Sequence, residues 1–355
     1  FLDRGCLFEI FTDNPHIQNY FQQNGLKSYD ISDYLSGMLN NPSLLDNYDS
    51  IIEKYGFNEL DLSFCDSYVC QQPQNKKQLY FLAYILTWEH FLTLTKPDIV
   101  IATDGSEIFG RSYSLVARQL NIPVIFTNGG SIFPNRIKFD TDIWLQGWID
   151  QDLYADPLEG DDLQWVENYI STMQREKPII GGSAKRIYSR IRLTKAINYW
   201  LNVLIRGRCR SNYHNLFGSI RNFLISSVQN YANRSFYSNV KTTDNYFFFP
   251  MHVPYDSQLT LRAPDFTAQY IPIELCAKYL PEGYYIYVKE HPHSKGYIPT
   301  AWLRKLASLP NVKIMHVDTN SHDLIAHARG IITINSDVGW EAFMQSKPVI
   351  VLGHP

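Results

Sequence analysis

The sequence predicts an α/β protein that is built around parallel sheets and divided into two domains. Short runs of β-branched and aromatic residues alternate with segments of helical periodicity, which is typical of strand–helix–strand units. Two of these runs, Asp98–Thr103 and Tyr284–Lys289, end directly in polar turns, which is where open parallel sheets bind their ligands. A chain of 355 residues also forms two domains more often than one.

The first domain is predicted to cover residues 1–150. Apolar residues recur at helical spacing over Gln78–Thr95, and the buried strand Asp98–Thr103 follows. A second helix is expected over Ser112–Leu120 and a second strand over Val124–Thr127. The order strand, helix, strand favours a parallel sheet in this half of the chain.

The second domain is predicted to cover residues 244–355. The aromatic run Asn245–Pro250 predicts its first strand, and Thr267–Leu280 predicts a helix. The strand Tyr284–Lys289 comes next. The segment Gly330–Gly353 then shows a strand, a polar turn, a short helix and another strand, which is a βαβ unit.

Between the two domains, residues 151–243 are predicted to form a linker and a basic helical insertion. The linker is acidic, whereas the stretch Lys177–Thr243 contains twelve basic residues and no Asp or Glu. One interpretation is an insertion whose cations face solvent or the acidic linker. The other is that residues 185–225 lie on an anionic membrane surface, with Trp and Tyr side chains at the depth of the headgroups.

The overall composition excludes several classes of protein. The formal net charge of −3 gives no general attraction to nucleic acids. No run of about 18 apolar residues is present, so the sequence predicts no membrane-spanning segment. The five cysteines show no metal-binding spacing, which favours a reducing compartment. Because the chain begins at Phe1 and stops at Pro355 just after a strand, we expect it to be part of a longer protein with a truncated second domain.

Polar residues at the strand ends of the second domain are candidates for binding a nucleotide. His291 follows Lys289 and Glu290, and Pro292 holds it in an extended backbone from which its imidazole can donate to a phosphate oxygen. The alternative is a structural histidine. Ser336 precedes a predicted helix, so it is a plain N-cap, a phosphate ligand, or both. Glu341 lies in that helix and is either an exposed residue or an acceptor for ribose hydroxyls.

In the first domain, Asp104 and Glu107 are the candidates for acid–base chemistry. Asp104 stands beside Gly105 at a strand end, where a carboxylate can approach a substrate hydroxyl; the alternative is a turn residue that caps the next helix. Gly129 and Gly130 would let the backbone approach a ligand. No GxGxxG or Walker fingerprint is present, which disfavours a standard dinucleotide or P-loop enzyme.

Four segments of the chain resemble the capsule polysaccharide biosynthesis family of bacterial glycosyltransferase-like proteins. Tyr246–Pro254, followed by Asp256, is similar to the first strand of the family's donor domain, and Val288–Pro292 is similar to its Lys-Glu-His-Pro motif. Thr333–Gly353 is similar to its Asn-Ser, Gly-x-Glu-Ala and Lys-Pro-Val motif, and Asp104–Pro134 is more loosely similar to its acceptor-domain segment. The resemblance covers about residues 95–140 and 244–355.

This resemblance implies a GT-B architecture, in which two Rossmann-like domains face each other across a cleft, here with a helical basic insertion. It implies a glycosyltransferase that uses neither a metal nor a cofactor. A CMP-sugar donor is favoured, since family members transfer Kdo from its CMP-activated form, and the acceptor would be a bacterial surface polysaccharide or its lipid-linked precursor. Asp104 would act near the acceptor or the anomeric carbon, with Glu107 in reserve. The implied donor-binding residues are His252, Lys289, His291, Pro292, Asn335, Ser336, Gly339 and Glu341.

Two alternatives remain open from the sequence. One is a polyol-phosphate transferase of the teichoic-acid type, whose donor domain carries similar His-Pro and Ser motifs. The other is a non-catalytic module that binds a glycan or nucleotide in capsule assembly. In each case we expect a cytoplasmic protein, or one held on the inner face of the plasma membrane.

Overall fold

The computed structural model describes residues 7–13, 15–63, 66, 69–102, 108–128, 138–141, 157–177, 216–254 and 256–353. The chain divides into two compact units. The first comprises Phe1–Ile125 and Arg190–Arg221, and the second comprises Phe126–Ser189 and Asn222–Pro355. Each unit has its own arrangement of helices and strands.

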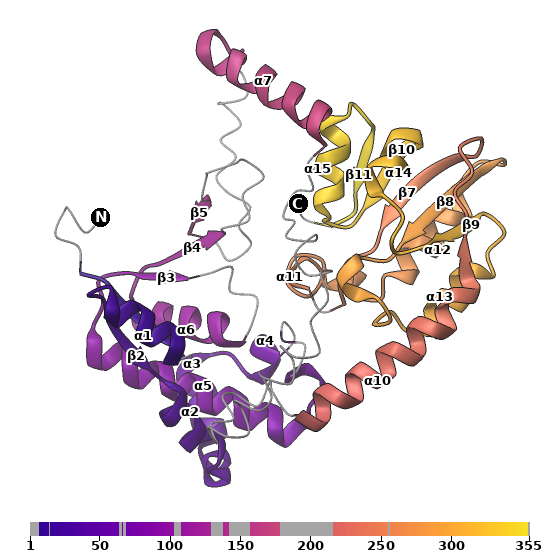
Figure 1. Ribbon diagram of the computed structural model, residues 1–355. Coiled ribbons are helices and arrows are strands. Elements are labelled where there is room, and N and C mark those ends of the chain that lie inside the picture. Colours follow the sequence, from indigo (N-terminus) through magenta and orange to yellow (C-terminus); the bar gives the residue numbers. More distant parts are fainter. Residues whose placement is uncertain are drawn as a thin grey trace. The chain divides into compact units, whose positions relative to one another are not determined.

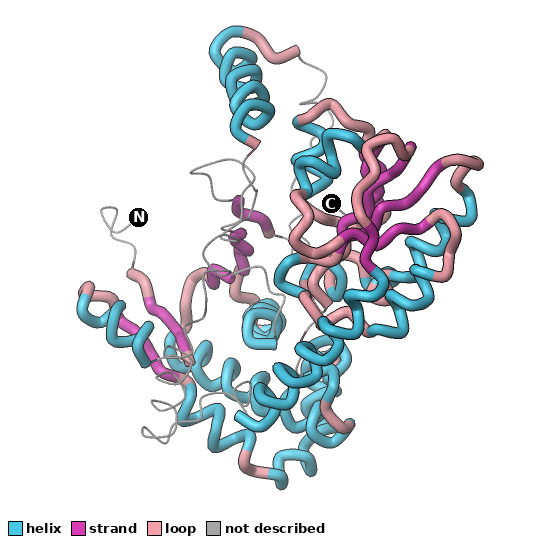
Figure 2. Tube along the Cα trace, turned by 45° about the vertical axis from the view of Figure 1, so that its right-hand side comes forward, coloured by secondary structure: helices cyan, strands magenta, loops and turns pink. Residues whose placement is uncertain are grey.

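The second unit is built on a six-stranded sheet in which every pair of neighbouring strands is parallel. The strand order is β11-β10-β7-β8-β9-β6, and Figures 1 and 2 show the strands lying side by side. The strands are β6 (Tyr237–Ser238), β7 (Asn245–Pro250), β8 (Tyr284–Lys289), β9 (Val312–Met315), β10 (Gly330–Thr333) and β11 (Val349–Val351).

Helices cover both faces of this sheet. Alternate strand residues point to opposite faces, so the sheet supports two separate cores. On one face Phe249 and Val288 pack with residues of α11, α12 and α13. On the other face Tyr246 and Tyr287 stack at 3.9 Å between ring centroids and pack with residues of α14 and α15. The helices are α11 (Ser257–Thr260), α12 (Tyr270–Tyr279), α13 (Thr300–Ala307), α14 (Ser321–His327) and α15 (Asp337–Met344).

The chain reverses its direction across the sheet between β7 and β10. From β7 the chain passes outward through β8 and β9, and it then returns to the other side of β7 to form β10 and β11. Since β7 and β10 are hydrogen-bonded neighbours, the connections that leave their carboxyl ends diverge there. Open α/β sheets bind ligands in the crevice at such a point, so the fold itself marks a candidate site.

Two longer helices belong wholly or partly to the second unit. The carboxyl end of α7 (Gly160–Glu176) packs on α15, where Gln174 Nε2 donates to the Met344 carbonyl at 2.9 Å (Figure 1). The acidic stretch predicted as a linker therefore contains a helix that is anchored at its carboxyl end. The helix α10 (Leu216–Asn233) leads through the 3-10 turn Arg234–Phe236 into β6.

The first unit is mostly helical around α5 (Gln74–Thr95). The middle of this helix, residues 80–92, is buried on nearly all sides, and its Phe81, Tyr84 and Trp88 are almost fully inaccessible to solvent. The other elements are β1 (Glu9–Thr12), α1 (Pro15–Gln23), β2 (Lys27–Asp30), α2 (Ser32–Leu39), α3 (Tyr48–Tyr55), α4 (Glu59–Ser63), β3 (Val100–Ala102), α6 (Ile108–Gln119) and the first two residues of β4 (Val124–Asn128). Strands β1 and β2 pair in parallel. The β4 residues that pair antiparallel with β5 (Lys138–Asp140) are residues 126–128, which fall in the second unit together with β5.

The α/β fold class and the parallel sheet of the second domain are confirmed. The sequence analysis missed α13, β9 and α14, because these elements are short and carry no polar motif. The helix expected from Gln78 begins one turn earlier, at Gln74, and ends where Lys96 takes a left-handed conformation with φ of 46°. The facing of two domains across a cleft stays a prediction.

Candidate functional site

A hydrogen bond joins the two strand ends at the point where the chain reverses direction. His252 follows β7 and Asn335 follows β10, and the Asn335 backbone N–H donates to His252 Nε2 at 3.1 Å. Burial lowers the pKa of His252 to about 4, so the imidazole is neutral and its Nε2 is free of a proton near neutral pH. His252 therefore holds the loop after β10, and its Nε2 is already used within the protein.

Side chains around His252 fix the same loops. The buried Gln269 makes two bonds to the His252 backbone: its Oε1 accepts from the N–H at 2.7 Å, and its Nε2 donates to the carbonyl at 3.1 Å. Asn335 Nδ2 donates to the Gln258 carbonyl at 2.9 Å. Gly353 leaves no room for a side chain, since a β-carbon there would lie 2.6 Å from Asn335 Oδ1. The site is thus preorganised before any ligand arrives.

Ser336 caps α15, as one interpretation of the sequence predicted. Its Oγ accepts from the Val338 N–H at 3.3 Å, and its own N–H donates to Thr333 Oγ1 at 3.0 Å. This cap occupies the Val338 N–H, and the Ser336 carbonyl accepts from the Gly339 N–H at 2.8 Å, so the Asp337 N–H is the donor of the first three helical residues that is left for an anion. Gly339 lies in the same helix and allows its close approach to β10, because a β-carbon there would be 3.1 Å from Thr333 Cγ2.

Charged residues beside the α15 N-terminus were not singled out from the sequence. Asp337 is the first helical residue, and burial together with the neighbouring Asp256 raises the pKa of its carboxyl, an effect that Arg262 partly offsets. Arg262 is itself buried. A phosphate at this helix end would meet the Asp337 carboxylate, so the nearby guanidinium is the group that can balance a second negative charge.

Lys289 and Glu341 come together on the sheet face that α14 and α15 cover. Lys289 is the last residue of β8, and its Nζ donates to Ser321 Oγ at 3.0 Å. Burial lowers the pKa of Lys289 to about 8, while Asp318 and Glu341 act in the opposite direction. Both Lys289 and Glu341 are buried, so each compensates charge for the other in an environment poor in water.

Glu290, the second residue of the Lys-Glu-His-Pro motif, was overlooked as a candidate. It is 0% exposed, and its Oε1 accepts a hydrogen bond from the Tyr237 hydroxyl at 2.7 Å. Its Oε2 is buried and has no hydrogen-bond partner among the described residues. Burial raises the pKa of Glu290 to about 7, although the Tyr237 bond and Lys295 counteract part of that rise. The motif pointed to this position, but only the tertiary structure shows a buried carboxyl.

His291 and Pro292 form a turn that is held by its own hydrogen bonds. The His291 carbonyl accepts from the N–H and from the Oγ of the buried Ser294, each at 2.9 Å. Pro292 opens the 3-10 turn Pro292–Ser294, and the His291 side chain is half-buried. The turn ends near Gly296, whose φ of 77° and contact with α10 exclude a side chain, since a β-carbon would lie 2.0 Å from the Ser226 carbonyl oxygen.

The structure places the predicted donor-side residues at one edge of the sheet. His252, His291 and Ser336 follow β7, β8 and β10, which are adjacent parallel strands, so all three lie at the carboxyl edge. The predicted catalytic residues Asp104 and Glu107 and the acceptor-side glycines Gly105, Gly129 and Gly130 lie outside the described residues. The same holds for residues 185–215 of the basic segment.

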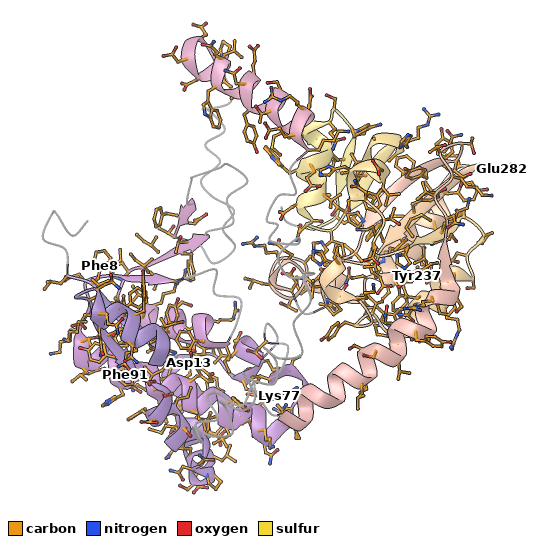
Figure 3. The ribbon with its side chains drawn as sticks, in the orientation of Figure 1. Phe8, Asp13, Lys77, Phe91, Tyr237 and Glu282 are labelled. Atoms are coloured by element: carbon orange, nitrogen blue, oxygen red, sulfur yellow. The ribbon has the colours of Figure 1, made fainter. Side chains whose placement is uncertain are left out.

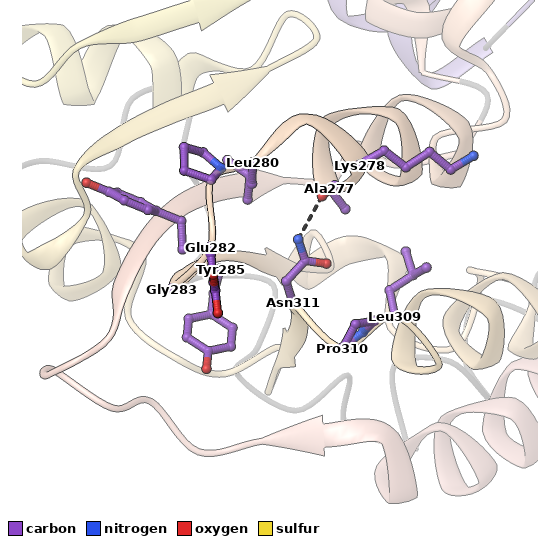
Figure 4. Close-up of a pocket in the computed structure, with 11 residues that line it drawn as sticks. Ala277, Lys278, Leu280, Glu282, Gly283, Tyr285, Leu309, Pro310 and Asn311 are labelled. Carbon is purple, nitrogen blue, oxygen red and sulfur yellow. Dashed lines mark hydrogen bonds between the residues drawn. The ribbon is translucent and has the colours of Figure 1, made fainter.

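A separate pocket of about 460 Å³ lies at the opposite, amino edge of the sheet (Figure 4). It lies between the carboxyl end of α12 and the segments that precede β8 and β9, and Asn311 Nδ2 donates to the Ala277 carbonyl at 2.7 Å in its wall. None of the predicted site residues lines it. Its position at the amino ends of the strands is unlike that of nucleotide sites in this class of fold.

Two further features concern the described part of the chain only. None of its helices is long and apolar enough to cross a membrane. Within the same residues, no three His, Cys, Asp or Glu side chains are grouped as they would be around a metal ion.

Comparison with known families confirms the resemblance seen in the motifs. Residues 194–355 match the family described as "Capsule polysaccharide biosynthesis protein". The match contains the whole six-stranded sheet and every donor-side residue discussed above. The looser resemblance over residues 95–140 lies outside it.

Individual relatives are more distant. Protein FixF of Sinorhizobium fredii (strain NBRC 101917 / NGR234) is 32% identical over 149 residues, which are 41% of this chain and 36% of that protein. The chain thus matches about a third of the length of this curated relative. Among solved structures, the beta Kdo 2,4 transferase of Thermosulfurimonas dismutans KpsC is 16% identical with a TM-score of 0.42, covering 73% of this chain and 70% of its own. The beta Kdo 2,7 transferase of the same KpsC is 22% identical with a TM-score of 0.27, covering 44% and 47%.

Proposed function

We propose that this protein is a glycosyltransferase that moves a sugar from a nucleotide-activated donor, preferably a CMP-sugar, to a bacterial surface polysaccharide or its lipid-linked precursor. The observation that carries the proposal is that the family match and the candidate ligand site fall on the same sheet. The family match spans the six-stranded sheet, in which His252 and Ser336 follow the strands that flank the direction-reversal point and His291 follows the next strand, β8. Parallel sheets of this topology bind nucleotides at that point.

The donor phosphate would lie at the α15 N-terminus. The Ser336 hydroxyl and the Asp337 N–H would donate to it, Arg262 would balance the Asp337 carboxylate, and the His291 imidazole would donate from the end of β8. Lys289 and Glu341 lie beside this edge as a buried pair of opposite charge. In this scheme Glu341 either accepts from the ribose hydroxyls or keeps Lys289 in place.

We assign the bond-making step at the sugar to the predicted first domain, residues 1–150. Asp104 would act as the base or the nucleophile, and Glu107 is the reserve candidate; both are proposals from the sequence. Changing Asp104 to Asn should lower turnover by roughly 10²–10⁴-fold, the usual range for a general acid–base group, while nucleotide binding survives. A variant that loses nucleotide affinity and keeps its turnover would reassign the residue.

Metal independence is also a proposal. Two Asp-x-Asp sequences, at 140–142 and 150–152, are of the kind that can hold a divalent ion, and of these six residues the structure describes Asp140 and Thr141. Turnover that persists in a chelator would support the metal-free mechanism. Turnover that a chelator abolishes and Mg²⁺ restores would overturn it and direct attention to these two sequences.

The donor can be identified by thermal shift with CMP, UDP, GDP and CDP. A nucleotide at a hundredfold excess over its Kd should stabilise the protein by about 2.7 kcal/mol, and we expect CMP to give the largest shift. His291→Ala should remove most of that shift. The matched control is His327→Ala, which changes an exposed histidine at the carboxyl end of α14, on the amino side of the sheet.

The outcome of this screen separates the alternatives. If no nucleotide shifts the melting temperature, or if His327→Ala weakens the shift as much as His291→Ala, the proposed donor site is wrong. Binding without any turnover would favour a non-catalytic module. A product that contains a new phosphodiester, seen by ³¹P NMR, would favour a polyol-phosphate transferase.

A further inference from the structure

The helix α10 exposes an apolar face. Leu224 is 56% exposed, Val228 69% and Tyr231 75%, and Ile225 beside them is 46% exposed. Residues 224, 228 and 231 are spaced by four and three positions, so their side chains lie on one side of the helix. They form a continuous stripe, which we call the α10 stripe.

Among the side chains of α10 that the structure describes, those opposite the stripe are polar and face the second unit. Asn233 is 0% exposed, and the Ser226 carbonyl and the Asn230 β-carbon lie against the position of Gly296. An amphipathic helix of a globular protein normally buries its apolar side and exposes its polar side. In the described part of α10, residues 224–233, this order is inverted, so packing against the second unit does not explain the α10 stripe.

The chain around α10 carries a strong positive charge. Twelve Lys and Arg and no Asp or Glu lie within Lys177–Thr243, which contains the helix. Because the whole chain has a formal net charge of −3, the remaining residues together carry −15. The exposed Arg234 lies at the end of the stripe, with its guanidinium 5.8 Å from the centre of the Tyr231 ring.

We propose that the α10 stripe docks on the surface of an anionic phospholipid bilayer. Leu224, Ile225 and Val228 would enter the boundary of the acyl chains, Tyr231 would lie at the depth of the headgroups, and Arg234 would contact lipid phosphates. Aliphatic side chains flanked by tyrosine and cations are the composition of a helix that lies in the membrane interface. Membrane binding gains from the apolar area that is buried and from electrostatic attraction to anionic headgroups. The positive charge of the segment around α10 therefore favours an anionic lipid surface over a neutral one.

A second exposed apolar face, on α12, provides a matched control. Ile271 is 50% exposed, Leu275 53% and Tyr279 81%, and these residues are spaced by four. This face differs in charge, because Glu274 pairs with Lys278 at 3.3 Å and with Lys305 at 2.6 Å. The α12 face therefore has similar apolar exposure, but its two lysines are paired with a carboxylate and it lies outside the basic segment Lys177–Thr243, so we do not expect it to bind anionic lipid.

The test is co-sedimentation with vesicles of phosphatidylcholine alone or mixed with phosphatidylglycerol. We expect the protein to bind the mixed vesicles and to be released as the salt concentration rises, because screening shortens the range of the attraction. The double variant L224S/V228S should lower the vesicle partition coefficient about tenfold or more, since two aliphatic side chains no longer enter the acyl boundary. The control variant I271S/L275S should bind like the unchanged protein. Arg234→Glu should weaken binding mainly at low salt.

Several outcomes would overturn the proposal. One is that L224S/V228S binds the mixed vesicles as strongly as the unchanged protein. Another is that the control I271S/L275S loses as much vesicle binding as L224S/V228S. A third is that the unchanged protein binds vesicles with and without phosphatidylglycerol equally. A dimer in solution that L224S/V228S dissociates, without vesicle binding, would assign the stripe to a second copy of the chain. Far-UV circular dichroism and the urea midpoint establish that each variant is folded. The nucleotide thermal shift should be unchanged in every variant, which keeps this test separate from that of the proposed function.

Discussion

The Tyr237 hydroxyl donates a 2.7 Å hydrogen bond to Glu290 Oε1, and this bond joins the edge strand β6 to the turn that carries His291. Tyr237, labelled in Figure 3, follows α10 after one short turn, so the helix, the edge strand and the predicted phosphate-binding histidine are linked through adjacent residues. Gly296 adds a second contact between the same turn and α10. The turn that carries His291 is therefore held by two contacts with the basic segment, one from Tyr237 and one from α10.

Glu290 should make the stability of the protein depend on pH. Its folded-state pKa of about 7 lies above the ordinary value of 4.5, so the native state binds the proton more tightly than the unfolded state. This contribution is fully present below about pH 4.5 and is lost as the pH rises through about 7. Glu290→Gln keeps an acceptor for Tyr237 and should raise the free energy of unfolding near pH 8 by an amount on the order of 3 kcal/mol.

Urea unfolding of the unchanged protein and of Glu290→Gln, at about pH 5 and about pH 8, measures this effect. The control is Glu282→Gln, which changes an exposed carboxyl in the turn before β8 (Figure 3). A Glu290→Gln variant whose stability relative to the unchanged protein is the same at both pH values would show that the carboxyl is not buried as described.

His252 should act in the opposite direction over an overlapping range. Its pKa of about 4 lies below the ordinary 6.5, so its contribution to stability is present above about pH 6.5 and is lost as the pH falls through about 4. The two effects oppose each other between about pH 4.5 and 6.5. Acid should therefore destabilise Glu290→Gln more steeply than the unchanged protein, and it should destabilise His252→Gln less. Unfolding curves of the two variants with parallel pH profiles would contradict this assignment.

Substitutions at Ser336 can separate capping from phosphate binding. Ser336→Ala removes the acceptor for the Val338 N–H, so it should cost about 1 kcal/mol of stability and also weaken the nucleotide thermal shift. Ser336→Asp keeps a good cap but places a carboxylate where the phosphate is proposed, so it should retain stability and lose the shift. Differential scanning fluorimetry with and without CMP measures both quantities. An Asp variant with an undiminished shift would remove Ser336 from the donor site.

Two glycines with the same backbone conformation should respond differently to alanine. Gly283 and Gly296 have φ of 82° and 77°, so alanine at either position strains the backbone by roughly 1–2 kcal/mol. Nothing lies within 4 Å of a β-carbon at Gly283, whereas at Gly296 that carbon meets the Ser226 carbonyl oxygen at 2.0 Å. Gly296→Ala should therefore cost roughly 1–3 kcal/mol more than Gly283→Ala in urea unfolding. Equal costs would mean that the turn and α10 are not packed together.

The sequence by itself determined the order of the second domain's main elements and the chemistry of its strand ends. Strands β7, β8 and β10 are strongly apolar and stop at polar turns, and this local pattern is sufficient to place His252, His291 and Ser336 at one edge of a parallel sheet. The Lys-Glu-His-Pro and Asn-Ser motifs were also sufficient to predict the family that residues 194–355 match.

The tertiary structure alone decided what each of these residues contacts. Whether Glu290 is a surface carboxyl or a buried one depends on Tyr237, which is separated from it by 53 positions in the chain. The bond from Asn335 to His252 spans 83 positions, and the exposure of the α10 stripe depends on which side of the helix meets the turn at Gly296. Burial and desolvation arise from such distant contacts, and they set pKa values and exposed surfaces that local sequence patterns do not encode.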